Sequence, residues 1–462
     1  MGEKTEHHIV MLPLMAQGHL IPFLALANQI HQKFGFRITI ASTPLNIQYL
    51  TSAIAKHSTI PHRQIHLFGL SFDSRDHNLP PNTENTETLP HHQIANFFHA
   101  TTSLESPFRS LISDISIKDG HPPLCIISDV FMGWANEVAK SCGTVNVTFT
   151  TGGAYGTAAL VSIWQNLPHH STNGNEFNVP GFPDSCTFHI TQLHPFLRAA
   201  DDVFRKYTKL PIWSVGPLIP STMLTEKTKK SRIIAQQHMG RNPSVPLVEC
   251  MEWLDLHPEK SVLYVSFGSQ NTITPSQMME LAIGLEDSER PFIWVIRPPV
   301  GFNLRGEFKS EWLPKDYEER MMNTKQGLIV HGWAPQMEIL CHKSTGAFLS
   351  HCGWNSIMES LSQGVPIIGW PLAAEQTYNS KMLTEEMGVC VELTRGLQSS
   401  ISSEQVKKVI NTVMGEEAEE MKQKATKIGE LIRASITNEE SNKALDDFVS
   451  ALLSNKQELV CV

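Results

Sequence analysis

The feature that most constrains this chain is a repeated alternation of short apolar, β-branched runs with segments of helical spacing. In the first half, such runs lie at residues 8–14, 37–43, 64–70, 124–129 and 145–150. In the second half, they lie at residues 261–267, 291–296, 327–331, 346–350 and 365–369. Between them, segments such as residues 20–34 and 133–141 place apolar side chains on one helical face. This alternation predicts parallel sheets covered by helices on both faces.

A change of composition in the middle of the chain separates two such α/β halves. Residues 217–246 are rich in Pro, Ser, Thr and Lys and carry no periodic apolar face, which is typical of a linker. The 462 residues are enough for roughly two to four domains. We predict the following division: an N-terminal domain over 1–216, a linker over 217–250, a C-terminal domain over 251–435, and a C-terminal helix over 436–462 that packs back across the domains.

Charge and cysteine content disfavour several classes of protein. The chain has 37 Lys and Arg against 46 Asp and Glu and no long basic run, so we expect no nucleic-acid partner. Its eight cysteines are scattered without a CxxC pair, which is typical of reduced thiols. We find no signal peptide pattern and no run of about 18 apolar residues. We therefore expect a cytoplasmic monomer without a membrane span.

Two polar residues stand at the carboxyl ends of predicted strands in the first half. His19 lies at the turn between the first strand and the first helix, and Asp129 ends the strand at 124–129. Because ligands of open parallel sheets bind outside the carboxyl ends of the strands, the two side chains could meet there. A histidine oriented by a carboxylate is a competent general base for a hydroxyl. The alternative is structural, with His19 at a helix start and Asp129 at a turn.

A strand-to-helix turn in the second half could hold an anion. The segment Ser350-His-Cys-Gly-Trp-Asn-Ser356 follows a strand, and a helix is predicted to begin at or near Asn355-Ser356. Free N–H groups at that helix start would suit a diphosphate. An ordinary capped turn is the simpler interpretation. Metal binding by His351-Cys352 is disfavoured, because no second ligand pair has suitable spacing.

Several catalytic motifs are missing from the sequence. No GxSxG, HExxH, GxGxxG or GxxxxGK[ST] pattern occurs. This disfavours hydrolases, zinc proteases, P-loop enzymes and nicotinamide-dependent oxidoreductases. A nucleotide could still bind by another device.

Residues 333–376 resemble the signature box of the plant secondary-product UDP-glycosyltransferases, glycosyltransferase family 1. The matching stretches are Trp333-Ala-Pro-Gln-Met-Glu-Ile-Leu340, Ser350-His-Cys-Gly-Trp-Asn-Ser-Ile-Met-Glu-Ser360, Gly364-Val-Pro-Ile-Ile-Gly-Trp-Pro371 and Glu375-Gln376. Together they span the family's 44 residues without a gap. His19, Ser128-Asp129 and the turn Ser266-Phe-Gly-Ser269 match as well. The resemblance implies an α/β GT-B architecture: two Rossmann-like, doubly wound domains facing a cleft, the first binding the acceptor and the second the UDP-sugar.

The resemblance also implies roles for individual residues. The donor-binding positions are Ser269, Trp333, Ala334, Gln336, His351, Trp354, Asn355, Ser356, Glu359, Glu375 and Gln376. By motif position, Trp333 would stack on uracil with Gln336 nearby, and Glu359 would hold the ribose hydroxyls. Ser269, His351, Asn355 and Ser356 would take the diphosphate. Trp354, Glu375 and Gln376 would face the sugar, and glutamine at the last position is the family's usual residue for glucose.

The mechanism implied is a single displacement with inversion. His19 would remove the proton of the acceptor hydroxyl, Asp129 would balance the imidazolium, and UDP would leave toward the helix start. No metal and no cofactor beyond the co-substrate UDP-glucose would be needed. The predicted protein is a hexosyltransferase acting on a small lipophilic phenolic, flavonoid or terpenoid acceptor. Phe97, Phe98, Tyr155 and Trp164 could line the acceptor pocket or belong to the core.

One departure from the family pattern lies between Phe188 and Val215-Gly-Pro217. The family carries a helix and a strand with an Asn-Thr pair there, and this chain has neither near Asp201-Asp202. A strand–helix unit of roughly 30 residues is therefore predicted to be missing. Since its removal would expose backbone groups and apolar surface, an alternative function is that of an inactive or misfolded variant that at most binds UDP-sugar.

Overall fold

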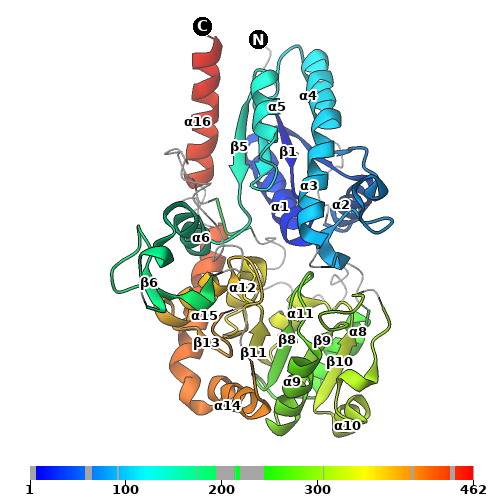
Figure 1. Cartoon of the computed structure of the whole chain (residues 1–462), viewed down its shortest axis with the longest axis vertical. Coiled ribbons are helices and arrows are strands. Elements are labelled where there is room, and N and C mark those ends of the chain that lie inside the picture. Colours follow the sequence, from blue (N-terminus) through cyan, green and yellow to red (C-terminus); the bar gives the residue numbers. More distant parts are fainter. Residues whose placement is uncertain are drawn as a thin grey trace. The chain divides into compact units, whose positions relative to one another are not determined.

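The computed structural model describes residues 7–57, 65–90, 93–172, 174–193, 213, 215–218, 244–304, 306–396, 400–437 and 443–460. These residues belong to two compact units. Unit 1 consists of residues 1–151, 213–241 and 438–462, and unit 2 consists of residues 152–212 and 242–437. Each unit contains its own parallel sheet with helices against it (Figure 1).

The sheet of unit 1 has the strand order β3-β2-β1-β4-β5, and every described pairing in it is parallel. Its strands are β1 His8–Leu12, β2 Arg37–Ser42, β3 Ile65–Gly69, β4 Cys125–Asp129 and β5 Val145–Phe149. β1 and β4 run through the centre and are buried along their whole length, because these segments are apolar without alternation. The order reverses between β1 and β4, which is the doubly wound arrangement.

Helices cover both faces of this sheet. They are α1 Gln17–Phe34, α2 Pro44–His57, α3 Ile94–Ala100, α4 Glu105–Asp119, α5 Ala135–Ser141 and α16 Lys443–Val460. Val10 and Leu12 pack in the core with α3, α4 and α5, whereas Ile9 and Met11 pack with α1 and α16. The alternation of side chains along β1 therefore supplies one residue in turn to each of the two cores.

The sheet of unit 2 has the order β10-β9-β8-β11-β12-β13 and is also parallel. Its strands are β8 Val262–Ser266, β9 Phe292–Ile296, β10 Gly327–His331, β11 Thr345–Ser350, β12 Ile367–Gly369 and β13 Cys390–Glu392. The order reverses between β8 and β11. Two Rossmann-like units are thus present, as the sequence predicts.

The helices of unit 2 pack on its sheet or on one another. They are α6 Ala154–Asn166, α8 Leu247–Asp255, α9 Pro275–Asp287, α10 Tyr317–Thr324, α11 Gln336–Cys341, α12 Trp354–Ser362, α13 Gln376–Lys381, α14 Ser403–Met414 and α15 Glu419–Thr437. Leu263 and Val265 pack with α9, α10 and α14. Val262 and Tyr264 pack with α8 and α11 on the other face.

The boundary between the units differs from the predicted domain boundary at 216. Residues 152–193, expected in the N-terminal domain, pack with unit 2. They form α6 and a short antiparallel hairpin, β6 Glu176–Asn178 with β7 Thr187–His189. Phe188 of this hairpin lies against Tyr378 of α13, with ring centroids 5.9 Å apart. Buried aromatic contacts therefore place residues 152–193 with unit 2. The sequence alone does not show these contacts.

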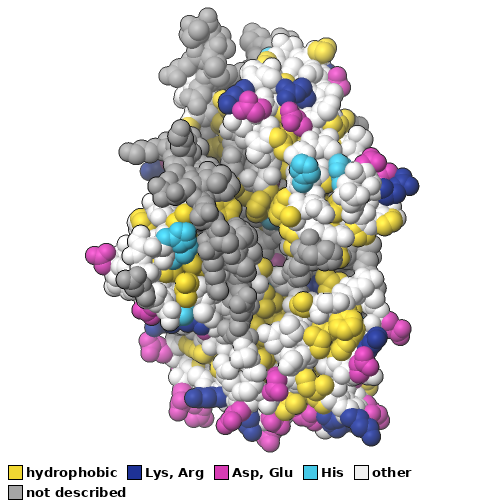
Figure 2. Space-filling view, in the orientation of Figure 1, with side chains coloured by type: hydrophobic (Ala, Val, Ile, Leu, Met, Phe, Trp, Pro, Cys, Tyr) yellow, Lys and Arg dark blue, Asp and Glu magenta, His cyan; other side chains and the backbone are white. Residues whose placement is uncertain are grey.

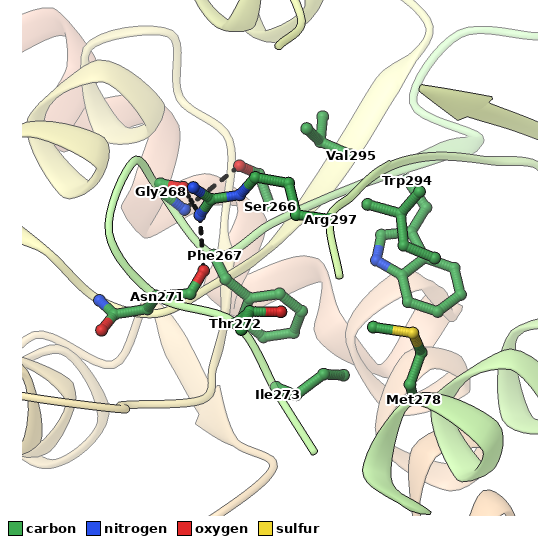
Figure 3. A pocket seen from close by; sticks show the side chains of 11 residues that line it. Ser266, Phe267, Gly268, Asn271, Thr272, Ile273, Met278, Trp294, Val295 and Arg297 are labelled. Atoms are coloured by element: carbon green, nitrogen blue, oxygen red, sulfur yellow. Dashed lines mark hydrogen bonds between the residues drawn. The ribbon is translucent and has the colours of Figure 1, made fainter. Parts of the chain in front are cut away.

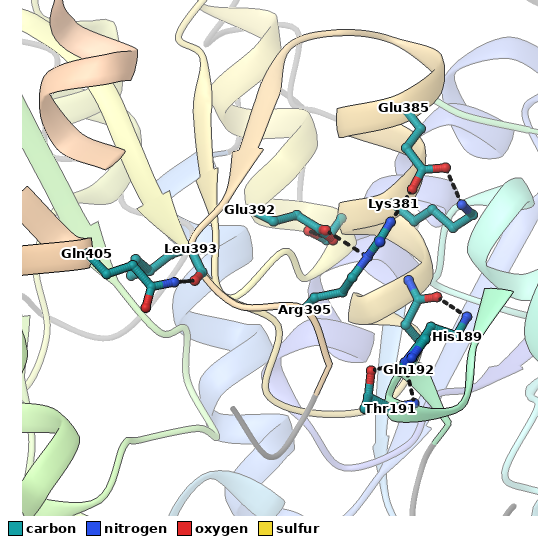
Figure 4. Close-up of polar contacts among 10 residues, drawn as sticks. His189, Thr191, Gln192, Lys381, Glu385, Glu392, Leu393, Arg395 and Gln405 are labelled. Carbon is teal, nitrogen blue, oxygen red and sulfur yellow. Dashed lines mark hydrogen bonds and ion pairs between the residues drawn. The ribbon is translucent and has the colours of Figure 1, made fainter. Parts of the chain in front are cut away.

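A buried lysine strengthens this attachment. The Lys381 side chain is 1% exposed, lies over the Phe188 ring at 5.3 Å and pairs with Glu385. Glu385 also pairs with Arg395, so one carboxylate joins two cations (Figure 4). Thr377 adds a hydrogen bond to the backbone oxygen of Gln192 at 3.0 Å. The pair with Glu385 compensates the buried charge, and the contacts of Lys381 with Phe188 and of Thr377 with Gln192 join the hairpin segment to α13.

Two further predicted boundaries shift in the structure. The last residues of the predicted linker, 247–250, form the first turn of α8. The predicted C-terminal helix over 436–462 is divided, since α15 ends at Thr437 in unit 2 and α16 belongs to unit 1. The predicted gap near Asp201-Asp202 lies outside the described residues.

The described surface mixes charges of both signs. On the face shown in Figure 2, Lys and Arg side chains lie interspersed with Asp and Glu. No helix in the described ranges combines the length and the apolar character needed to cross a bilayer.

Candidate functional site

Both sheets place polar residues where their strand order reverses. In unit 1 this point lies beyond the carboxyl ends of β1 and β4, where His19 and Asp129 stand. In unit 2 it lies beyond β8 and β11, where the turn at 266–271 and His351 stand. Ligands of open α/β sheets bind at such points.

His19 and Asp129 form a hydrogen-bonded pair in unit 1. The Nδ1 atom of His19 lies 2.7 Å from Oδ2 of Asp129, whose side chain is fully buried. The other carboxylate oxygen accepts the N–H of Phe131 at 3.1 Å, which fixes the carboxylate plane. Because Asp129 accepts the Nδ1 proton, Nε2 of the neutral ring is left as the basic nitrogen. The meeting of the two side chains that the sequence suggested is therefore present.

An aromatic surface adjoins this pair. The Phe131 ring lies edge-on to the His19 ring with centroids 5.9 Å apart, and it stacks on Phe98 at 4.9 Å. Phe131 is 47% exposed. Thr151 also contacts the ring, with its Oγ1 3.3 Å from Nδ1 of His19. The base is thus bordered by exposed apolar surface suited to a lipophilic group.

The four aromatic residues considered as acceptor contacts separate in the structure. Phe97 is fully buried in the core of unit 1, whereas Phe98 is half-buried and reaches Phe131. Tyr155 and Trp164 lie on α6 in unit 2 and pack against its hairpin cluster. Phe98 is connected to His19 through Phe131.

In unit 2, two loops meet around His351. This residue follows β11, is 8% exposed, and has no hydrogen-bond partner at Nδ1 among the described residues. A Cβ atom on Gly268 would lie 2.5 Å from Cε1 of the ring, and one on Gly353 would lie 2.5 Å from Nε2. Both glycines are therefore required for the imidazole to lie between the loops. Ser269 follows Gly268 in the same turn.

The electrostatics of His351 follow from its burial. Burial, together with the smaller effect of the nearby positive charge of Arg297, lowers its pKa to about 4. The ring is consequently neutral near pH 7. A neutral, buried imidazole with an unsatisfied nitrogen is suited to one hydrogen bond with a polar ligand.

A second cluster links α11 and α12. Nε2 of Gln336 donates to Oε2 of Glu359 at 2.5 Å and to Oγ of Ser356 at 3.1 Å. The hydroxyl of Tyr264 donates to Oε1 of Gln336 at 3.2 Å. Burial raises the pKa of the Glu359 carboxyl to about 7, partly opposed by the Gln336 hydrogen bond. The structure thus brings together Gln336, Ser356 and Glu359.

Trp333 and Ala334 lie in the loop between β10 and α11. The backbone N–H of Trp333 donates to Oγ of Ser244 at 3.0 Å. The backbone oxygen of Trp333 accepts the backbone N–H of Ser244 at 2.8 Å. The indole is half-buried, while Ala334 is 6% exposed. This pairing fixes the backbone from which the Trp333 ring projects.

Trp354 and Asn355 are the first two residues of α12, which begins one residue before the predicted start. The backbone of Gly153 approaches Trp354 closely enough that a Cβ there would lie 2.5 Å from Cε3 of the indole. Cys352, just before the helix, has a left-handed φ of 61°. The first turn of α12 therefore follows directly from a tight turn after β11.

Glu375 and Gln376 lie at the start of α13. Oε1 of Gln376 accepts the N–H groups of Leu372 and Ala373 at 3.0 and 2.8 Å, so this oxygen holds the preceding loop. Oε1 of Glu375 accepts from Asn379 at 3.4 Å. Gln376 is 7% exposed.

Two residues of these sites escaped the sequence analysis. Phe131 comes two residues after Asp129, and Arg297 comes directly after β9. Both follow the carboxyl end of a strand, and that position was the available signal. Across the described ranges, no group of three or more His, Cys, Asp or Glu is arranged to hold a metal ion.

Comparison with known proteins gives matches over both units. A family model described as UDP-glucoronosyl and UDP-glucosyl transferase matches residues 234–433. A second, described as glycosyltransferase, N-terminal domain, matches residues 6–166.

Individual relatives match over nearly the whole chain. UDP-glycosyltransferase 92A1 of Arabidopsis thaliana is 36% identical, with 97% of this chain and 98% of that protein covered. Crocetin glucosyltransferase 3 of Crocus sativus is 39% identical, with 89% and 92% covered. The solved structure of UGT73P12 from Glycyrrhiza uralensis, complexed with glycyrrhetinic acid 3-O-monoglucuronide, has a TM-score of 0.81 at 26% identity. It covers 99% of this chain and 97% of that one.

The alignments also contain gaps in this chain. The alignment with the Arabidopsis relative has 497 positions. It includes 97% of the 462 residues of this chain, which is about 448 residues. About 49 aligned positions of that relative therefore have no counterpart here. The number exceeds the roughly 30 residues predicted to be missing.

Proposed function

Because the chain belongs to the UDP-glycosyltransferase family, we propose that it transfers glucose from UDP-glucose to a hydroxyl group of a small lipophilic acceptor, with inversion at the anomeric carbon. The observation that carries the proposal is the His19–Asp129 pair at the strand reversal of unit 1. Membership of the family gives the enzyme class and the GT-B architecture.

The acceptor chemistry is assigned to unit 1. Nε2 of His19 takes the proton of the acceptor hydroxyl while that oxygen attacks the anomeric carbon of the sugar. Asp129 accepts the hydrogen bond from Nδ1 and stabilises the imidazolium that forms. The exposed Phe131 ring beside His19 supports an apolar or aromatic acceptor body, such as a phenolic, flavonoid or terpenoid.

The donor chemistry is assigned to unit 2. Trp333 offers its ring to the uracil, Glu359 accepts from the ribose hydroxyls, and Ser269, His351, Asn355 and Ser356 take the diphosphate. The unsatisfied Nδ1 of His351 and the glycines that enclose its ring support this assignment. As the bond from the anomeric carbon to the diphosphate breaks, UDP leaves with the electron pair, and the positive end of α12 stabilises its charge.

The choice of glucose rests on Gln376 and on the relatives. Glutamine at the last box position is typical of glucose-using members, and one relative is named as a glucosyltransferase for crocetin. With the charge of the leaving UDP assigned to α12 and His351, the proposal includes no metal. A chelator is expected to leave the transfer rate unchanged.

The test compares the parent with His19→Ala and the matched control His66→Ala, an exposed histidine on β3 in the same unit. With UDP-glucose and a panel of phenolic acceptors, mass spectrometry should detect hexose addition by the parent and by His66→Ala. His19→Ala should lose about 10²–10⁴-fold in kcat/KM while its Kd for UDP stays unchanged. A His19→Ala enzyme as fast as the parent would show that the base is assigned wrongly.

A second candidate function, an inactive chain that at most binds UDP, is favoured by the gaps in the alignments. Thermal unfolding with and without millimolar UDP distinguishes the two. A ligand that binds only the native state raises the stability by RT ln(1 + [L]/Kd). A cooperative transition that rises with UDP, together with hexose transfer, supports the enzyme. The same rise without transfer to any acceptor in the panel supports the second candidate.

A further inference from the structure

Arg297 binds the turn that follows β8 by three hydrogen bonds to backbone oxygens. Its Nη1 donates to the oxygen of Ser269, and its Nη2 donates to the oxygens of Gly268 and Asn271, each at 2.6 Å. Figure 3 shows the guanidinium directed at this turn, across a small pocket from Trp294 and Met278. One planar side chain therefore orients three of the peptide groups in the turn.

This orientation determines where the N–H groups of the turn point. In a trans peptide the oxygen and the following N–H point in opposite directions. Since the oxygens of Gly268 and Ser269 face the guanidinium, the N–H groups of Ser269 and Gln270 face away from it. Gly268 has a left-handed φ of 71°. Successive N–H groups beside a left-handed residue form concave anion-binding sites.

An independent observation at the same turn points to a ligand. The His351 ring lies against Gly268 and is buried, and its Nδ1 has no hydrogen-bond partner in the described ranges. The nine-residue helix α12 begins three residues later, at Trp354. Backbone N–H groups from the turn, an unsatisfied imidazole nitrogen and a helix N-terminus thus occur together in unit 2.

We propose that Arg297 is a positioning residue for the diphosphate of the UDP-sugar, holding the turn so that the N–H groups of Ser269 and Gln270 bind phosphate oxygen. This inference rests on the proposed function. The guanidinium acts from behind the turn through its hydrogen bonds to carbonyl oxygens. A lysine has the charge but not the planar fork, so it can satisfy these oxygens only in part.

The experiment measures the Kd of UDP and of uridine by calorimetry for the parent, Arg297→Gln, Arg297→Lys and Arg320→Gln. Arg320 is a matched control, because it is an arginine of unit 2 paired with Glu286 on the outer surface. Arg297→Gln should weaken UDP binding about tenfold or more while changing uridine binding less than about twofold. Arg297→Lys should fall between Arg297→Gln and the parent, and Arg320→Gln should match the parent.

The outcomes separate this inference from the proposed function. A parent chain that binds no UDP contradicts the proposed function itself. A parent that binds UDP and an Arg297→Gln variant that binds it equally well overturn the inference alone. Equal losses for UDP and uridine also overturn it, because they indicate a general structural role for Arg297.

A second variant covers the case in which Arg297→Gln does not unfold cooperatively. Gly268→Ala places a methyl group against His351 and strains a left-handed residue, so it disturbs the same turn while leaving Arg297 in place. It should show the same selective loss of UDP over uridine. Parental UDP binding by Gly268→Ala would contradict the proposed role of this turn.

Discussion

Nδ1 of His19 lies 2.7 Å from Oδ2 of Asp129, although 110 residues separate them in the sequence. The neighbouring positions of β1 and β4 explain the contact, because Leu12 pairs with Ser128 in the sheet, Asp129 ends β4, and His19 lies in the helix that follows β1. The buried carboxylate is held by a backbone N–H as well. Because the two side chains act together, the effect of substituting one of them on the transfer rate should depend on whether the other is present.

We expect Asp129→Asn to lower kcat about 10²–10³-fold with the Kd for UDP unchanged. An amide can present its NH₂ to Nδ1, which places the ring proton on Nε2 and removes the base. The double variant His19→Ala/Asp129→Asn should be no slower than the more damaging single variant. Losses that multiply in steady-state kinetics would contradict a coupled pair.

We expect Phe131→Ala to raise the KM for an aromatic acceptor while leaving the Kd for UDP unchanged. The ring is exposed beside His19 and stacked on Phe98, so its removal takes away apolar contact area without opening the core. Ile117→Ala, at an 81% exposed position of the same unit, serves as the control. Equal KM values for both variants would show that the acceptor lies elsewhere.

Glu359 should make stability depend on pH. Burial raises its pKa to about 7 from 4.5, so the folded chain holds this proton to a higher pH than the unfolded chain does. The stabilisation of the folded state by this bound proton is complete below about pH 4.5 and is lost as the pH rises through about 7. The parent should therefore lose stability as the pH rises from about 4.5 to about 7, and the Tm of Glu359→Gln should rise relative to that of the parent over this range. The exposed control Glu311→Gln should run parallel to the parent.

UDP binding should release a proton from Glu359. If the ribose hydroxyls donate to this carboxyl group, binding favours its ionised form and lowers a pKa of about 7. Calorimetry near pH 6.5 in buffers of different ionisation enthalpy measures the proton release. Glu359→Gln should abolish it, and an unchanged release would exclude Glu359 as its source.

Gly153→Ala should destabilise unit 2 by about 1–3 kcal/mol, because the added methyl group overlaps the Trp354 ring. Gly133→Ala adds the same group where nothing lies within 4 Å, so it should change the stability little. Thermal unfolding of the two variants checks the difference. A Tm for Gly153→Ala equal to that of Gly133→Ala would mean that α6 can move aside at no cost.

The strands and the site motifs could be predicted because each consists of contiguous residues. The apolar runs at 8–14 and 124–129 contain β1 and β4, and from their carboxyl ends the meeting of His19 and Asp129 could be anticipated. Likewise, Ser350 to Ser356 locates the turn before α12. Such features depend on local pattern and on the geometry of parallel sheets.

The features that escaped prediction depend on long-range packing. The hairpin strands at 176–178 and 187–189 are only three residues long, and their attachment to unit 2 comes from Phe188 and Lys381, far apart in the chain. The role of Arg297 depends on carbonyl oxygens 26–29 residues earlier in the chain. The spacing of residues within one segment does not indicate contacts with residues so far away in the sequence.

The last helix gives the N-terminal unit an unusual dependence on the order of synthesis. Leu445, Phe448, Val449 and Leu452 of α16 complete a core that begins with Ile9 and Met11. During translation, strands β1 to β5 emerge long before these side chains exist. Unit 2, whose residues lie within 152–437, can therefore bury its core first. The half of the chain made first must wait for the final residues before its own fold is complete.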